Sequence, residues 1–355
     1  MTSFTIGRRE VGPDEPTYFI ADIAANHDGD LNRALRLVEL AAGAGADAAK
    51  FQNFKAETIV SEFGFRSLGG QRSHQAAWTK SVTEVYSDAS IPVDWSPILE
   101  EHCLSCGIDY LTAPYDLDMI DGLAPHVCAW KVGSGDITWH ESIDLLARTG
   151  KPLLLATGAS SMDDVREAMA VAMQHCDRIV LMQCNTNYTG DLDNFRFVAL
   201  RVLETYAAEF PQAVLGLSDH TPGHATVLGA VVLGARVVEK HFTDNRARAG
   251  PDHAFSMEPS DWRSMVDRTR ELEAALGEPT KRIMDNESET AVLQRRAIRA
   301  AHRLEEGALL VRSDLAMLRP CPAEGVPPSR LKDVLGRRLR RTVEAGDALQ
   351  LDDLL

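Results

Sequence analysis

Short apolar runs alternate with amphipathic stretches from residue 17 to about residue 277 of this 355-residue chain. Such runs are typical of buried parallel strands, and the stretches between them have the 3.6-residue spacing of helices. This rhythm predicts an α/β fold, a (β/α)8 barrel of the TIM type, with a doubly wound open sheet as the structural alternative. The expected strands are Tyr18–Ala24, Ala48–Phe54, Tyr110–Pro114, Trp130–Ser134, Leu153–Gly158, Ile179–Cys184, Leu215–His220 and Val237–Thr243.

Helical spacing fills most of the gaps between these strands. The expected helices include Asn32–Ala46, Trp95–Gly107, Met162–Cys176, Asp193–Phe210, Ala225–Ala235 and Asp261–Gly277. One connection is different, because about forty residues between Phe54 and Trp95 show no sustained periodicity. Loops of that length in compact domains are usually lids or binding loops. We therefore expect this segment to border a site.

The last sixty residues have another pattern. A motif that begins at Leu304 and ends in Asp314-Leu315 recurs from Val343 and ends in Asp353-Leu354. This pseudo-repeat predicts short strands and turns, in a domain too small for catalysis by itself. We expect a barrel domain at 1–277, a polar linker at 278–294 and a small domain at 295–355.

Composition excludes several classes of function. The net charge of −15 argues against nonspecific binding to nucleic acid. No apolar run approaches the roughly 18–20 residues that span a bilayer, and the N-terminus lacks the apolar core of a signal peptide. The six cysteines have no framework spacing and are expected as reduced thiols. These features predict a cytoplasmic protein with no membrane or nucleic-acid partner.

Polar residues gather at the carboxyl ends of the predicted strands, where barrel enzymes hold their sites. Residues i and i+2 of a strand share a face, so Ser218 and His220 point together, as do Glu239 and His241. Their strands are neighbours in the predicted barrel. Two imidazoles at one height, with Glu239 and other acidic side chains nearby, predict an open site for a divalent metal.

Two lysines, Lys50 and Lys131, point into the predicted barrel. A buried ammonium group is costly without an anionic partner, so both are explained by a phosphate and a carboxylate of a substrate. The hydroxyls of Ser134, Thr157 and Ser218, beside glycine-opened backbone, complete an anion cradle. From residue types alone, the chain is a metal-dependent lyase or transferase that acts on a small phosphorylated acid.

The motifs together resemble the sialic acid synthase family, and residues 295–355 resemble its C-terminal antifreeze-like domain. The resemblance covers nearly the whole chain in the right order. The motifs that carry it are Ala21-Asp22, Asn26–Asp30, Gly45–Gln52, Lys131–Gly135, Ser218–Thr221, Glu239–Thr243, Gly250–His253, Leu318-Arg319-Pro320, Gly325–Pro328 and Leu335–Arg337.

The resemblance implies condensation of phosphoenolpyruvate with an N-acyl aldose of the N-acetylmannosamine type, giving a nine-carbon 2-keto acid sugar and phosphate. It also implies Mn²⁺ or Mg²⁺ as cofactor and a domain-swapped homodimer. Acidic strand-end residues would stabilise the cation that forms at C2 and activate water. The implied roles are metal for His220 and His241, phosphoenolpyruvate for Lys50, Lys131, Ser134 and Ser218, sugar for Gln52, Tyr188, Asp252 and the partner's Arg319, and catalysis for Asp22, Asp136 and Glu239.

Some positions depart from the family pattern. Asp22 and Asp136 stand where the family usually has glutamate, and Thr186 stands where it has asparagine. Ala113 and Ala156 replace small hydroxyl residues. Sialic, legionaminic-type and pseudaminic-type products all remain open at this point. So do a synthase that uses a different aldose and a catalytically silent carbohydrate-binding homologue.

Overall fold

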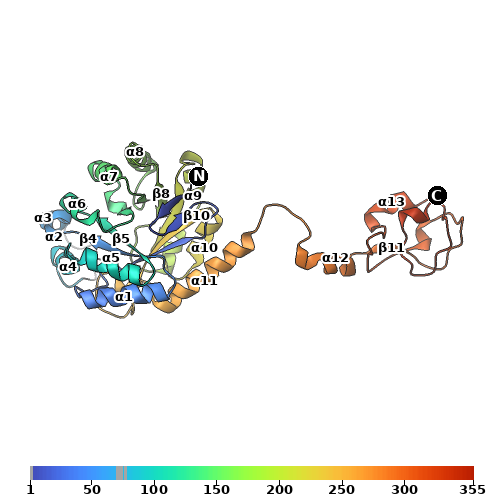
Figure 1. The fold of residues 1–355 in the computed structure, drawn as a ribbon, viewed down its shortest axis with the longest axis horizontal. Coiled ribbons are helices and arrows are strands. Elements are labelled where there is room, and N and C mark those ends of the chain that lie inside the picture. The colour runs from blue at the N-terminus through green and yellow to red at the C-terminus, as the bar shows by residue number, and fades with distance from the viewer. Residues whose placement is uncertain (1–2, 69–74, 76–77) are drawn as a thin grey trace. The chain divides into compact units, whose positions relative to one another are not determined.

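The computed structural model describes residues 3–68, 75 and 78–355, and the chain forms two compact units, Met1–Gly277 and Glu278–Leu355 (Figure 1). In the first unit, eight parallel strands close in the order β10-β3-β4-β5-β6-β7-β8-β9. The predicted TIM-type barrel is therefore confirmed, and the open sheet is excluded. The strands are β3 (Tyr18–Asp22), β4 (Ala48–Asn53), β5 (Asp109–Pro114), β6 (Trp130–Val132), β7 (Leu153–Ala156), β8 (Ile179–Cys184), β9 (Val214–Asp219) and β10 (Ala235–His241).

Helices surround the barrel, and their starts follow from local capping. Ser161 and Asp164 form a capping box at the start of α8, and Ser81 and Glu84 form another at the start of α4. The helices of this unit are α1 (Leu31–Gly43), α2 (Ala56–Ile59), α3 (Glu62–Ser67), α4 (Val82–Ala89), α5 (Trp95–Ser105), α6 (Ile120–Leu123), α7 (His140–Arg148), α8 (Met162–Ala172), α9 (Val202–Glu209), α10 (Ala225–Val232) and α11 (Pro259–Leu276).

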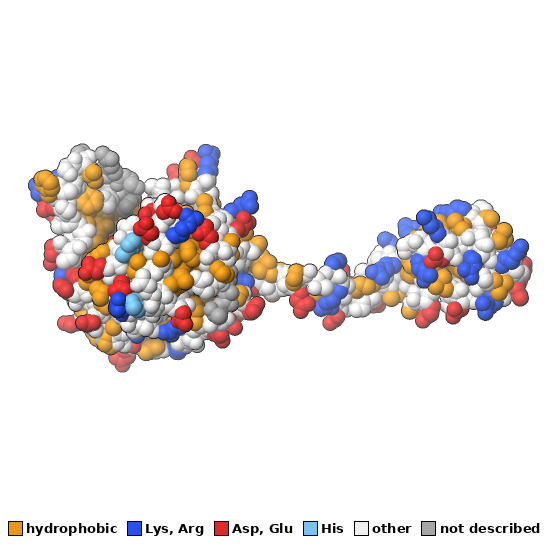
Figure 2. Space-filling model, turned by 90° about the horizontal axis from the view of Figure 1, so that it is seen from above, with side chains coloured by type: hydrophobic (Ala, Val, Ile, Leu, Met, Phe, Trp, Pro, Cys, Tyr) orange, Lys and Arg blue, Asp and Glu red, His pale blue; other side chains and the backbone are white. Residues whose placement is uncertain are grey.

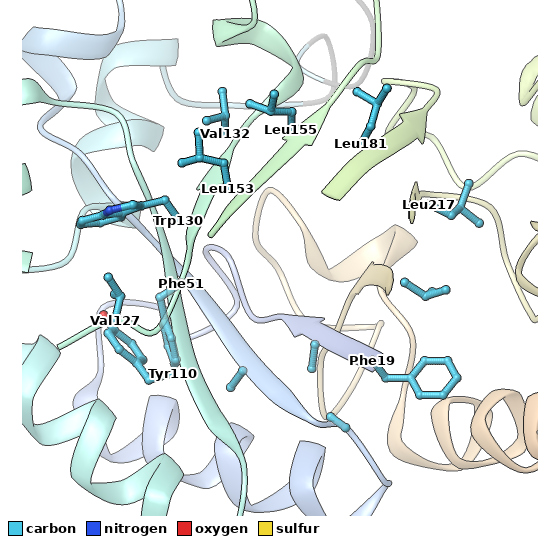
Figure 3. Packing of buried hydrophobic residues seen from close by; sticks show 14 of the residues in the cluster. Phe19, Phe51, Tyr110, Val127, Trp130, Val132, Leu153, Leu155, Leu181 and Leu217 are labelled. Carbon is cyan, nitrogen blue, oxygen red and sulfur yellow. The ribbon is translucent and has the colours of Figure 1, made fainter. Parts of the chain in front are cut away.

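Alternate strand residues build two separate cores. Outward side chains such as Phe19, Phe51 and Trp130 pack in the layer between strands and helices (Figure 3). Inward residues such as Ile20 and Leu154 fill the lower half of the barrel. An N-terminal hairpin of β1 (Phe4–Ile6) and β2 (Arg9–Val11), which the sequence reading did not predict, packs with this inner core. The upper half of the barrel is left for polar side chains.

One expected helix is wrong in extent. Residues 193–210 were expected as a single helix, but the chain forms a 3₁₀ segment, Leu192–Phe197, followed by α9 (Val202–Glu209). Ala199 between them has φ of +51°, a left-handed conformation that a continuous α-helix cannot contain. The long connection after Phe54 also holds more structure than expected, since α2, α3 and α4 lie in it.

The second unit confirms the pseudo-repeat at the level of hydrogen bonds. Leu304 and Val343, which occupy the same place in the two copies, exchange backbone N–H···O bonds of 2.9 and 3.0 Å. Gly307 and Gly346, also equivalent, both have positive φ, +81° and +86°. The unit contains α12 (Ser288–Gln294), β11 (Ala297–Ala300), β12 (Leu315–Leu318) and α13 (Leu331–Val334), and β11 pairs antiparallel with β12.

Charge is distributed unevenly between the units. Residues 278–355 carry 14 Lys and Arg against 13 Asp and Glu, so the excess of acid in the chain belongs to residues 1–277. Figure 2 shows many basic side chains on the visible face of the second unit. Within the described part of the chain, no helix has the length and apolar character needed to cross a membrane.

Candidate active site

A cavity of about 360 Å³ opens at the carboxyl ends of the barrel strands. Its floor consists of side chains from the strands themselves, and its rim consists of side chains from the loops that follow them. The sequence-predicted residues that line it are Asp22, Lys50, Gln52, Lys131, Ser134, Asp136, Tyr188, Ser218, His220, Glu239, His241 and Asp252.

Strand register brings the charged residues of the floor together. His241 of β10 lies opposite Asp22 of β3, which in turn lies opposite Lys50 of β4. The Lys50 Nζ is 2.8 Å from Asp22 Oδ2 and 3.1 Å from Glu239 Oε1, and all three side chains are at most 5% exposed. Burial lowers the pKa of Lys50, but Asp22 and Glu239 outweigh it and the net shift is upward. Lys50 is therefore a fixed positive charge.

Lys131 is less completely paired. Its Nζ donates to the Val132 carbonyl at 2.8 Å and lies 3.8 Å from Glu239 Oε1. Burial lowers its pKa, and Glu239 only partly opposes that shift. Glu239 Oε2 is buried with no hydrogen-bond partner among the described residues. Because buried polar atoms are nearly always satisfied, an under-paired lysine beside an orphaned carboxylate oxygen marks a place for a ligand.

The two histidines lie side by side in the same floor, next to these charged residues. Their ring centroids are 5.4 Å apart, and Tyr188 and Phe255 pack against both rings. His220 Nδ1 is 2.9 Å from the Asn185 carbonyl, so that nitrogen carries a proton, and Nε2 is the atom available to a metal when the ring is neutral.

His241 has the chemistry of a metal ligand as well. Its Nε2 is 3.5 Å from Asp22 Oδ2, and its Nδ1 is buried without a partner in the described structure. Burial and the neighbouring His220 hold the pKa of His241 well below its ordinary value, so the ring is neutral. Neutral imidazole is the form that ligates a metal. Within the described residues, no group of three or more His, Cys, Asp or Glu has the arrangement of a metal site.

The anion cradle is only partly as predicted. Ser134 Oγ accepts from the Gly158 N–H at 2.9 Å, and Ser218 Oγ donates to Glu239 Oε1 at 3.1 Å. Thr157 does not line the cavity: its hydroxyl bonds the Met182 carbonyl and Tyr206 behind the wall. Strand alternation explains this, because Ala156 of β7 faces the cavity and the next residue faces outward.

Glycine is required at Gly158 of the cradle. A Cβ there would lie 1.9 Å from Thr186 Oγ1 and 2.9 Å from Ser134 Oγ. Thr186 Oγ1 is itself buried and has no hydrogen-bond partner among the described residues. The buried Gly158 amide, which donates to Ser134 Oγ, and the hydroxyls of Ser134 and Thr186 therefore form a compact set of polar groups at the ends of β6, β7 and β8.

Two acidic residues stand at the rim. Burial raises the pKa of Asp136 to about 6 and that of Asp252 to about 6. Asp252 Oδ2 accepts from the Ala25 N–H at 3.1 Å. Carboxyl groups with a pKa near neutrality are suited to proton transfer at working pH.

A polar latch holds Asp252 in place. The adjacent His253 is fully buried, with Nδ1 2.7 Å from Thr243 Oγ1 and Nε2 2.9 Å from Asp28 Oδ1. Asp28 also accepts from Arg248 at 2.7 Å. The loop after β10 is thus tied to the loop after β3, and Asp252 is presented between them.

Four aromatic residues of the rim were missed by sequence reasoning. Phe54, Trp78 and Tyr86 come from the long connection after β4, and Tyr115 follows β5. The Tyr115 hydroxyl is close enough to Gly133 that a Cβ there would be 2.7 Å away. The sequence shows only that this long connection is rich in aromatic residues, which does not indicate which of them face the cavity. Arg319 belongs to the second unit, where it follows β12 and precedes Pro320 through a cis peptide bond.

Comparison with known proteins agrees with this geometry. Residues 37–281 match the NeuB family, and residues 295–355 match the SAF domain. An N,N'-diacetyllegionaminic acid synthase of Legionella pneumophila is 33% identical over 97% of this chain and 96% of its own length. The human N-acetylneuraminate-9-phosphate synthase is 30% identical over 96% of this chain and 93% of its own length.

A solved structure is similar as well. The N-acetylneuraminic acid (sialic acid) synthetase of Leptospira borgpetersenii, crystallised with citrate, superimposes with a TM-score of 0.70 at 25% identity. The match covers 81% of this chain and 95% of that one. The family match spans more than half of the sequence, and the relatives align over nearly all of it. This chain belongs to the NeuB family and carries a SAF domain at residues 295–355.

Proposed function

We propose that this protein condenses phosphoenolpyruvate with an N-acyl aldose of the N-acetylmannosamine type, releasing phosphate and a nine-carbon 2-keto acid sugar. The observation that carries the proposal is that two buried lysines and two buried histidines line the same cavity. The relatives named as synthases of acids of this kind support it. The proposed substrates need both an anion site and an electrophile-activating site, and the floor offers both.

Phosphoenolpyruvate is placed on the lysine side of the floor. Lys131, Ser134 and Thr186 line the cavity, the Gly158 N–H donates to Ser134 Oγ, and Lys50 lies beside Glu239. A carboxylate and a phosphate joined by one enol carbon match two ammonium groups set in a buried wall. The anionic substrate would supply a further partner for the Lys131 ammonium group.

The histidine side is proposed to receive the aldehyde. His220 and His241 would hold Mn²⁺ or Mg²⁺, which when bound supplies Lewis-acid polarisation of the aldehyde oxygen. C3 of the enol then attacks the aldehyde carbon and positive charge develops at C2. Glu239, with its free Oε2, stands where that charge is stabilised.

Water addition at C2 completes the reaction. Asp136, with a pKa of about 6, is suited to take a proton from the attacking water. Asp22 is fixed by Lys50 and the Ala24 N–H, so its proposed part is to orient the lysine and the neighbouring His241. The C2–O bond to phosphate then breaks, and the bridging oxygen leaves with the phosphate.

The direct test is phosphate release from phosphoenolpyruvate with a panel of N-acyl aldoses. We expect release only when both substrates and a divalent ion are present, one phosphate per keto acid sugar by mass spectrometry. Protein that binds phosphoenolpyruvate but releases no phosphate with any aldose would contradict the proposal. Full activity in excess chelator, with no bound metal, would show that the reaction needs no metal.

We also propose that the active unit is a homodimer in which residues 295–355 of one chain serve the barrel of the other, with Arg319 at the acyl group. The acidic barrel unit and the more basic second unit are electrostatically compatible. Mixing His220→Ala chains with Arg319→Ala chains should restore up to about a quarter of native activity, since about half the dimers are mixed and each has one intact site. No recovery after subunit exchange would show that each chain serves itself.

A further inference from the structure

We infer that the acceptor of the proposed reaction is an aldose without a phosphate group, whose apolar substituents pack against an aromatic wall at the cavity rim. This inference rests on the proposed function and deepens it by naming the acceptor's chemical class. The two relatives above are named for products with and without a phosphate, so membership of the family leaves the choice open.

The first argument is the balance of charge around the cavity. Among its described lining residues, the cations are Lys50 and Lys131, while four residues carry carboxyl groups. The carboxyl groups belong to Asp22, Asp136, Glu239 and Asp252. Both lysines lie in the floor and are matched by one phosphoenolpyruvate. A second phosphate has no lysine or arginine left to bind on the described wall of the barrel.

The second argument is where the remaining acids lie. Asp136 and Asp252 stand on the loop-built rim, which is the part of the cavity left for the acceptor once the floor is occupied. A phosphate dianion on the acceptor would face these carboxyl groups across a partly desolvated space. Like charges in such a space repel strongly, because little water screens them. Hydroxyl and acylamido groups of a neutral sugar instead donate hydrogen bonds to the same acids.

The third argument is the aromatic wall, which we define as Phe54, Trp78, Tyr86 and Tyr115. The ring centroids of Phe54 and Tyr86 are 5.5 Å apart, those of Phe54 and Tyr115 are 6.2 Å apart, and those of Trp78 and Tyr86 are 6.5 Å apart. Ile59 and Val85 line the cavity beside it. This surface gains free energy by covering methyl groups and C–H faces, and it carries no positive charge to compensate a desolvated phosphate.

The test compares acceptors on the full-length, Mn²⁺-loaded protein at saturating phosphoenolpyruvate. The probes are N-acetylmannosamine, its 6-phosphate and an N-acetylated 6-deoxy hexosamine. We expect kcat/KM at least about 10-fold higher for an unphosphorylated acceptor than for the 6-phosphate, equivalent to about 1.4 kcal/mol. Equal or better use of the 6-phosphate would overturn the inference and leave the proposed function standing. Absence of phosphate release with every acceptor would instead contradict the proposed function.

Binding gives the same ranking without turnover. Calorimetric titration of phosphoenolpyruvate-loaded protein should show heat of binding for a neutral acceptor and much weaker binding for the 6-phosphate. Tighter binding of the 6-phosphate would overturn the inference even in protein that does not turn over.

The wall itself is tested at Tyr86. Tyr86→Ala should raise the KM for the neutral acceptor about 5- to 10-fold, and Tyr86→Phe, which keeps the aromatic surface, should raise it less. The KM for phosphoenolpyruvate should not change in either variant. An unchanged acceptor KM in Tyr86→Ala, in protein with a native melting temperature, would show that the acceptor lies elsewhere.

Discussion

The floor and the rim of the cavity are built on different principles. The floor consists of strand residues, and Asp22, Lys50 and His241 lie on three adjacent strands in direct register. The rim consists of residues from the connections between strands, such as Asp136, Tyr86 of α4 and Asp252, and these connections differ in length and structure. Hydrogen bonding between strands fixes the register of the floor residues, whereas the rim depends on individual side-chain contacts such as that between Asp28 and His253.

Because of this difference, the floor and the rim are suited to different substrates. A floor held by the barrel is suited to the substrate shared by every reaction of this type. A rim held by side-chain contacts can vary and select the acceptor, as loops on a rigid scaffold commonly do. Floor substitutions should therefore affect metal, phosphoenolpyruvate and turnover, and rim substitutions should affect the acceptor.

The largest effect is expected in the histidine pair of the floor. His241→Ala should abolish tight binding of Mn²⁺ and lower turnover roughly 10³-fold, since Lewis-acid activation contributes several kcal/mol. Metal content by atomic emission and phosphate release check both. Phe242→Leu, directly after the end of β10, is a matched control, because Phe242 faces the outer core and the variant should retain metal. Native metal content in His241→Ala would place the ion elsewhere.

Asp136, at the border of floor and rim, should show the next largest effect. Asp136→Asn should lower turnover by ~10²-fold, the usual scale of acid–base assistance. In the native protein, activity should fall as pH drops through about 6, because the carboxyl group then becomes protonated. A native acid limb near pH 6 in Asp136→Asn would assign that limb to another group.

The Asp136 carboxyl group should lower the stability of the fold even though it increases turnover. Its pKa is raised in the folded state, so folding favours the neutral form, and above about pH 6 the buried carboxylate weakens the fold. Asp136→Asn should therefore raise the free energy of unfolding at pH 8 by about 1–2 kcal/mol, allowing for its partial exposure, with little gain near pH 4. Urea titrations at the two pH values measure this. A loss of stability at pH 8 would show that the carboxylate is compensated.

Lys131 tests the phosphoenolpyruvate half of the floor. A charge-assisted bond to a buried anion contributes about 1.5–3 kcal/mol, so Lys131→Met should weaken phosphoenolpyruvate binding roughly 10- to 150-fold. The acceptor KM should change little. Steady-state kinetics with each substrate varied separates the two, and unchanged affinity for phosphoenolpyruvate would retire the assignment.

The smallest effect is expected at the latch of the rim. Asp28→Asn weakens the ties to His253 and Arg248, and should raise the acceptor KM about 5-fold, the cost of roughly one hydrogen bond. Asp30→Asn, an exposed helix cap of the same loop, is the control and should leave that KM unchanged. A rise in the phosphoenolpyruvate KM instead would contradict the division between floor and rim.

The same division explains what the sequence could predict. Lys50 with Gln52, and Glu239 with His241, were placed correctly because strand side chains alternate with a period of two. Thr157 lies one position beyond the cavity-facing Ala156, because β7 ends at Ala156 whereas the strand was expected to extend to Gly158. Tyr86 was missed because no helix was predicted in the long connection, where it lies on α4, and Tyr115 was missed because it follows the end of β5, where no period gives its direction. The break at Ala199 was missed for a related reason, because apolar spacing does not report φ.

The central claim, that phosphoenolpyruvate adds to an aldose and then loses phosphate by C–O cleavage, is tested most directly with phosphoenolpyruvate labelled with ¹⁸O in the oxygen that bridges C2 and phosphorus. The protein is incubated with the labelled substrate, Mn²⁺ and N-acetylmannosamine, and both products are analysed by mass spectrometry. The account predicts that the label leaves with phosphate and that the new keto oxygen comes from water. Label retained in the keto acid, or phosphate released equally without the sugar, would contradict it.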